Sequence, residues 1–95
     1  MNVREEVQWF VQRMEEKMAK HDADRGDGWK EADVFSLTDR VWEELQELRE
    51  KLGEYEDDDP KAVVMAIYEC ADVANFAMMV ANHLRDDLPK DSELV

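Results

Sequence analysis

The sequence has few of the residues that build disulfide-rich, turn-rich or cationic proteins. A single cysteine, Cys70, excludes an intramolecular disulfide and is typical of a reducing compartment. Three glycines and two prolines are too few for a turn-rich β-sandwich. Lysine and arginine number 12 against 25 acidic residues, a net charge of −13. This charge argues against unspecific binding to nucleic acid or to anionic membranes, since both require a basic surface.

The length and composition favour one small helical domain. The chain has 95 residues, and its 44% apolar content distinguishes it from a disordered acidic tail although 39% of its residues are charged. The first residues, Met-Asn-Val-Arg-Glu-Glu, lack the basic-then-apolar pattern of a secretion signal. We therefore expect an all-α, soluble, cytoplasmic protein with a single domain over residues 1–95.

Hydrophobic periodicity predicts three helices, over about residues 2–21, 37–52 and 60–86. The first is amphipathic and needs a partner, because one face carries Val3, Val7, Phe10, Val11, Met14 and Met18. Residues 22–35 contain two glycines and are predicted to form a loop. Trp29 in this loop either packs onto the helices or faces a ligand, and packing is the more frequent role of such a residue.

Capping residues set the expected ends of the second and third helices. Ser36 is predicted to cap the second helix, with Asp39 three residues later in a capping-box position, and Gly53 is predicted to end it. An acidic linker follows and ends in Asp59-Pro60. An aspartate at the cap and a proline at the first helical position are a strong signal for the start of the third helix.

The third helix carries three polar residues in an otherwise apolar run. Between Ala62 and Ala81, seventeen of twenty residues are apolar, and the exceptions are Glu69, Asp72 and Asn75. They recur every three residues and so form one band on the helix. A buried carboxylate is costly unless it is protonated, paired with a cation or bound to a metal. Two acids in mid-span argue against a transmembrane helix.

The second helix supplies further acids, at Glu44 and Glu47, beside its apolar stripe. An antiparallel pairing of the second and third helices is predicted to bring four carboxylates together: Glu44, Glu47, Glu69 and Asp72. Either a lysine or arginine from another helix or a divalent cation must balance their charge. Mg²⁺ suits the set because it binds few carboxylates, keeps waters and recruits phosphate oxygens. A di-iron site is disfavoured because His21 and His83 lie outside the cluster.

The acidic motifs resemble a known family. Glu43-Glu44-x-x-Glu47, followed after twenty-one residues by Glu69-x-x-Asp72, is similar to the signature of the MazG-like nucleotide pyrophosphohydrolases, in the all-α NTP pyrophosphatase superfamily. The run from Glu69 to Met79 resembles the third helix of that family, and Gly28-Trp29-Lys30 resembles a segment of small MazG-like proteins. The resemblance covers roughly Glu15 to Leu84.

The resemblance implies hydrolysis of a nucleoside triphosphate or deoxynucleoside triphosphate to the monophosphate and pyrophosphate with Mg²⁺, for which Mn²⁺ is an alternative. It implies four metal ligands: Glu44, Glu47, Glu69 and Asp72. Glu43 is expected to hold or polarise the attacking water, which completes the catalytic set. Asn75, on the band of the third-helix acids, is a candidate for substrate contact. Nucleotide-pool house-cleaning is the role expected for such an enzyme, and the sequence leaves open the alternative of lowering an alarmone nucleotide.

Position and charge add four candidate substrate-binding residues. Lys30, Arg40 and Lys51 are placed to contact phosphates, and Trp29 to stack on a base. These assignments come from chemistry and position alone. The sequence does not indicate which base or sugar is preferred.

The family resemblance also implies an oligomer, and the sequence agrees. Two other helices cannot bury a helix that is apolar on every face, so we expect a homodimer or a dimer of dimers that completes a four-helix-bundle-type core. A rival interpretation is a non-enzymatic helical adaptor whose acids are ion-paired across an interface. It predicts no metal dependence and a fold insensitive to Glu69→Gln. Phosphoribosyl-ATP pyrophosphatase is a second rival, disfavoured because the flanking sequence resembles the MazG-like type.

Overall fold

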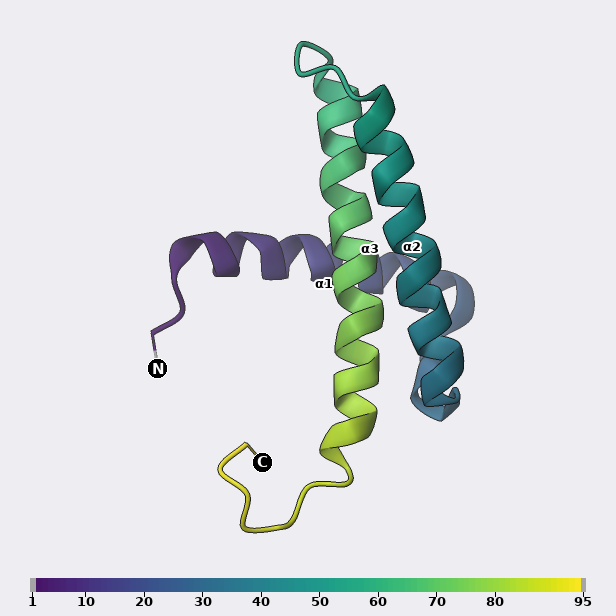
Figure 1. Ribbon diagram of the computed structural model, residues 1–95. Coiled ribbons are helices and arrows are strands. Elements are labelled where there is room, and N and C mark those ends of the chain that lie inside the picture. Colours follow the sequence, from purple (N-terminus) through teal and green to yellow (C-terminus); the bar gives the residue numbers. More distant parts are fainter. Residues whose placement is uncertain (1, 95) are drawn as a thin grey trace.

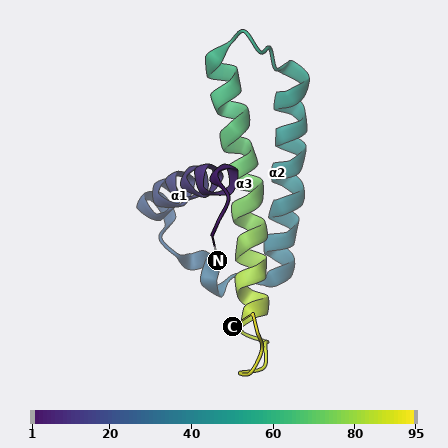
Figure 2. The same cartoon turned by 90° about the vertical axis from the view of Figure 1, so that its left-hand side faces the viewer.

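The computed structural model describes residues 2–94, and the regular secondary structure of these residues is helical, without a strand. The elements are α1 (Glu5–Arg25), the short 3₁₀ helix η1 (Gly28–Glu31), α2 (Val34–Glu54) and α3 (Pro60–Arg85). Helices α2 and α3 form an antiparallel hairpin, and α1 crosses it near mid-length instead of lying along it (Figure 1). The view in Figure 2 shows α1 on the α3 side of the hairpin, and α1 packs against α3. The predicted all-α class and helical hairpin are confirmed.

Helix α1 begins three residues later and ends four residues later than the sequence pattern predicts. It begins at Glu5 and continues through the polar run after His21 to Arg25, so the predicted loop starts four residues later than expected. Gly26 ends the helix with a φ of 67°, a left-handed conformation that favours glycine, and its N–H donates to the carbonyl of Asp22. Part of the expected loop is the single turn of η1. Hydrophobic periodicity failed here because the last turn of α1 has no apolar face to reveal it.

The predicted Ser36 cap is wrong, because α2 starts earlier. Asp33 is the N-cap, and its carboxylate accepts a hydrogen bond from the backbone N–H of Ser36 at 3.2 Å. Ser36 is therefore inside the first turn, and the expected capping box with Asp39 does not form. The helix also runs through Gly53 to Glu54, since a glycine in the last turn costs only about 1 kcal/mol.

The start of α3 agrees with the sequence. Asp59 caps the helix, its carboxylate accepting from the N–H groups of Lys61 and Ala62, and Pro60 occupies the first turn. The helix ends at Arg85, one residue before the expected end. This match follows from local chemistry, because an aspartate cap followed by proline specifies a helix start without help from tertiary contacts.

The chain buries little of its apolar surface. Among residues 2–94, the buried apolar side chains are Leu37, Ala66, Ala71 and Met79. Helix α3 is long and apolar enough to cross a membrane by length and composition alone, a test that core helices also pass, yet only 28% of its most apolar stretch is buried. Val7 and Val11 on α1, and Val64 and Leu84 on α3, are about half exposed. A large apolar surface therefore remains uncovered.

Candidate metal site

The antiparallel hairpin places three acidic side chains against one another. Glu44 and Glu47 lie one turn apart on α2 and face Glu69 on α3, and one carboxylate oxygen of each lies within 4.8 Å of the others. We call these three residues the acid triad. Glu44 is buried, Glu69 is half-buried and Glu47 is exposed, so the triad lies at the edge of the hairpin and is open to solvent on one side.

Asp72, the fourth acid predicted for this cluster, lies beside the triad and contacts two basic side chains of α1. Its Oδ2 is 3.3 Å from the Nζ of Lys17, and its Oδ1 is 4.0 Å from the Nε2 of His21. Its negative charge nevertheless helps to raise the pKa of both Glu44 and Glu69. A cation from another helix therefore balances one acid of the predicted cluster.

Burial and mutual repulsion change the acidity of the triad. Burial raises the pKa of Glu44 from 4.5 to about 7, and the charge of Glu47 and a hydrogen bond with it contribute next. Burial likewise raises the pKa of Glu69, followed by the charges of Asp72 and Glu47, while Lys51 and Lys17 act in the opposite direction. Near neutral pH and without a bound cation, the triad therefore favours holding a proton, since the proton reduces its negative charge.

Two oxygen atoms of this region are buried without a hydrogen-bond partner among residues 2–94. They are Oε2 of Glu69 and Oδ1 of Asp72. A buried carboxylate oxygen without a donor is costly, and a cation removes that cost. The triad offers only hard oxygen ligands, with no thiolate or imidazole, which is the donor chemistry that Mg²⁺ and Mn²⁺ prefer. The residues present therefore fit a hard divalent cation.

Arg40 interacts with the acids of its own helix. Its Nη1 donates to Oε2 of Glu43 at 2.6 Å, and its Nη2 donates to Oε1 of Glu44 at 3.0 Å. The guanidinium also lies over the ring of Phe76, 4.9 Å from its centroid. Glu43 is exposed and lies outside the acid triad. The structure thus brings Arg40 to the site as a partner of two glutamates, and these contacts engage the guanidinium that the sequence predicts to contact phosphate.

Asn75 joins α3 to α1. It is buried, and its Nδ2 donates to the backbone carbonyl of Met14 at 3.0 Å, whereas its Oδ1 has no partner among residues 2–94. The side chain that the sequence marks as a candidate substrate contact is in this structure an anchor between two helices. The helical band predicted from the sequence is present, but α1 covers its Asn75 end.

Trp29 and Lys30 lie on η1, apart from the triad. The Trp29 carbonyl oxygen is 3.1 Å from Nε2 of His83, and the half-buried Trp29 lines a separate cavity of about 320 Å³ with Leu37 and Phe76. Lys30 is exposed, with its Nζ 3.3 Å from Oδ2 of Asp27. Neither residue lines the cavity that Glu69 lines. Of the candidate substrate-binding residues, Lys51 lines that cavity, whereas Trp29 and Lys30 do not.

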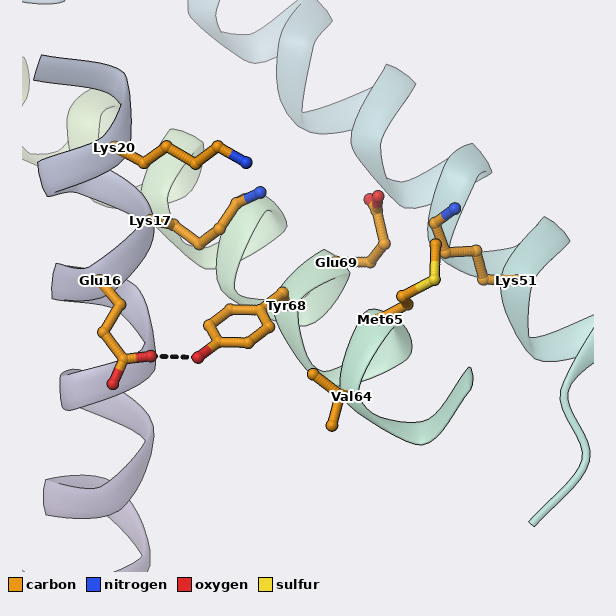
Figure 3. A pocket seen from close by; sticks show the side chains of 8 residues that line it. All are labelled: Glu16, Lys17, Lys20, Lys51, Val64, Met65, Tyr68 and Glu69. Atoms are coloured by element: carbon orange, nitrogen blue, oxygen red, sulfur yellow. Dashed lines mark hydrogen bonds between the residues drawn. The ribbon is translucent and has the colours of Figure 1, made fainter. Parts of the chain in front are cut away.

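Figure 3 shows the cavity beside Glu69, which has a volume of about 490 Å³. Its walls come from α1, α2 and α3: Glu16, Lys17, Lys20, Lys51, Val64, Met65, Tyr68 and Glu69. Sequence reasoning missed Lys17 and Lys20, because both are polar residues of an amphipathic helix, away from the apolar face that the periodicity reveals. No periodic signal indicates that this face turns toward a site on another helix.

Comparisons with other proteins add no relative. The chain matches no protein-family model, and it has no significant match among curated proteins or solved structures. The functional assignment therefore depends on the geometry of the acid triad and on the resemblance of the sequence motifs.

Proposed function

We propose that the protein is a Mg²⁺-dependent nucleoside triphosphate pyrophosphohydrolase that converts a triphosphate to the monophosphate and pyrophosphate. The observation that carries the proposal is the convergence of Glu44, Glu47 and Glu69 to within 4.8 Å across the hairpin. A lysine-lined cavity opens beside this triad. The MazG-like resemblance supplies the reaction type, and nucleotide-pool house-cleaning is the role proposed for it.

The acid triad would hold the cation, with Asp72 as a further ligand once Lys17 no longer pairs with it. When bound, Mg²⁺ neutralises phosphate oxygens and lowers the pKa of a water. Glu43 contributes a carboxylate at the edge of the site, held by Arg40 at 2.6 Å, where it can orient a water. Glu44 is buried, so its side of the triad is shielded from bulk water.

The proposal includes a homodimer. The isolated chain fully buries only 28% of the apolar stretch of α3, and Val7 and Val11 form an exposed pair one turn apart on α1. A second copy of the chain supplies matching apolar surfaces and completes a four-helix core. The net charge of −13 makes the charged faces of two copies repel each other, so the proposed dimer contact lies on the apolar surfaces.

The non-enzymatic helical adaptor remains the second candidate, and two observations favour it. Asp72 is paired with Lys17, and Glu44 is hydrogen-bonded to Arg40, so two of the acids already have cationic partners. The adaptor hypothesis does not explain the buried Oε2 of Glu69, which has no partner among the described residues.

The test is pyrophosphate release from a panel of standard and modified nucleoside triphosphates with Mg²⁺, with Mn²⁺ and with EDTA. We expect cation-dependent release that falls by about 100-fold or more in Glu69→Gln, since a bound cation contributes several kcal/mol to the barrier. Glu50→Gln, an exposed glutamate on α2, is the matched control and should retain activity. Absence of release from every nucleotide by the folded protein would overturn the proposal.

A further inference from the structure

The cavity beside the acid triad is lined by cations from two helices. Lys17 and Lys20 come from α1, and Lys51 comes from α2. In Figure 3 the side chains of Lys17 and Lys20 extend from α1 toward the carboxylate of Glu69, and the end of Lys51 lies on the other side of that carboxylate. The cavity thus presents ammonium groups on both sides of a candidate metal ligand.

These lysines are available to a ligand to different degrees. Neither Lys20 nor Lys51 forms an ion pair with any residue between 2 and 94, whereas Lys17 pairs with Asp72 at 3.3 Å. Glu16, the other acid of the cavity wall, accepts a hydrogen bond from the hydroxyl of Tyr68. The chain has 12 lysines and arginines against 25 acids, so three lysines at one cavity are a local departure from its overall charge.

We propose that this cavity binds the pyrophosphate portion of a triphosphate, with Lys17, Lys20 and Lys51 as its phosphate ligands. The inference rests on the proposed function for its substrate class. Ammonium groups bind phosphate oxygens as point charges. A cation on the triad would contact the same phosphates from the Glu69 side. The volume of about 490 Å³ is within the range of small-molecule sites.

The proposal gives α1 a role in the site. Phosphate competes with Asp72 for Lys17, so binding of the anion releases the carboxylate of Asp72 next to the triad. This exchange explains why Asp72 lies between the triad and α1. Its charge raises the pKa of both Glu44 and Glu69, and yet its carboxylate pairs with Lys17 of α1. The leaving group of the reaction then binds where α1 crosses the hairpin.

The experiment measures binding of inorganic pyrophosphate with Mg²⁺ by calorimetry. We expect Lys20→Ala and Lys51→Ala each to weaken binding by about tenfold, the usual effect of one charge-assisted hydrogen bond, with Lys20→Arg retaining most of the affinity. Binding of Mg²⁺ alone should remain at least as tight as in the wild type, because the substitutions remove positive charge beside the triad. Lys90→Ala, an exposed lysine of the C-terminal segment, is the matched control. Lys20 is also exposed, so its loss should leave the fold intact, which circular dichroism checks.

The outcomes separate this inference from the proposed function. If the wild type hydrolyses triphosphates but the lysine variants bind pyrophosphate as tightly as the wild type, the inference is overturned and the function stands. If pyrophosphate binds through the lysines and no triphosphate is hydrolysed, the binding site is supported and the proposed function fails. If the wild type binds no pyrophosphate, the inference is overturned.

Discussion

Lys17 on α1 and Asp72 on α3 form an ion pair, with Nζ 3.3 Å from Oδ2, directly beside the acid triad. The pair connects the crossing helix to the hairpin and neutralises one of the clustered carboxylates. Both side chains are largely shielded from water, at 24% and 11% exposure, so removing one partner is more costly than at an exposed ion pair. The stability of the α1 crossing and the charge state of the site are therefore linked.

Lys17→Met should destabilise the protein in EDTA. The substitution removes the positive charge that balances the carboxylate of Asp72 next to Glu44 and Glu69. We therefore expect the free energy of unfolding to fall by about 1–2 kcal/mol. Urea denaturation at pH 8 measures the loss. Lys20→Met, which removes an exposed lysine without an ion pair in the described chain, should change stability by less than about 0.5 kcal/mol. Equal stability of the two variants would contradict the role assigned to the pair.

Glu69→Gln should stabilise the protein in EDTA and abolish its response to Mg²⁺. Removing one of several clustered negative charges relieves repulsion, and we expect a gain of roughly 0.5 kcal/mol. The wild type should show a rise in melting temperature with Mg²⁺, as any ligand of the folded state produces, and the variant should not. A rise that persists in Glu69→Gln would place the cation elsewhere. Glu50→Gln again serves as the control.

The protein without metal should lose stability between about pH 5 and pH 8. The pKa of Glu44 is about 7 in the folded chain against an ordinary 4.5, so within this window the folded state holds a proton that the unfolded state has released. Stability falls with rising pH wherever the folded state binds more protons. Melting temperatures measured in EDTA across this range should decline, and Glu44→Gln should flatten the decline. A wild-type curve no steeper than that of the variant would contradict the assignment.

Mg²⁺ should reverse this loss at high pH. Protons and cations compete for the same carboxylates, so the increase in melting temperature with Mg²⁺ should be large at pH 8 and small at pH 5. The same titration with Mn²⁺ should follow the same pH dependence. An effect of equal size at both pH values would mean that the cation binds groups other than the triad.

Asn75→Ala tests whether Asn75 anchors α1 or contacts substrate. The substitution removes the 3.0 Å hydrogen bond to the Met14 carbonyl, and we expect a loss of about 1–3 kcal/mol in unfolding free energy. Limited proteolysis should cut α1 faster in the variant. Asn82→Ala, on the same helix, is the control. Unchanged stability with a raised KM would favour the substrate contact expected from the sequence.

Val7→Asp should weaken the proposed dimer. A charge within the exposed pair formed with Val11 on α1 disfavours burial at an interface between like-charged chains. We expect sedimentation equilibrium to give a dimer for the wild type and a shift toward monomer for the variant. Gln12→Asp adds the same charge at another exposed position of α1 and should leave the dimer intact. A monomeric wild type would overturn the proposed assembly.

Local sequence chemistry explains which parts of the fold were predictable. The start of α3 follows from Asp59 and Pro60, and the hairpin follows from two helices joined by a short linker. The end of α1 and the start of α2 were misplaced, because the intervening polar residues have no hydrophobic period. Asp33 and Ser36 are only three residues apart, and both residue types cap helices well. The sequence therefore does not decide which of them caps α2, and in the structure it is Asp33.

The sequence alone determined that Glu44 and Glu47 lie on one face of α2 and that Glu69 lies opposite them, since helical spacing and an antiparallel hairpin leave little freedom. Only the tertiary structure decided how α1 crosses α3. That crossing pairs Lys17 with Asp72, attaches Asn75 to the Met14 carbonyl and turns Lys20 toward the cavity beside Glu69. Periodicity gives the faces of a helix, whereas its crossing partner depends on side-chain packing between residues more than fifty positions apart.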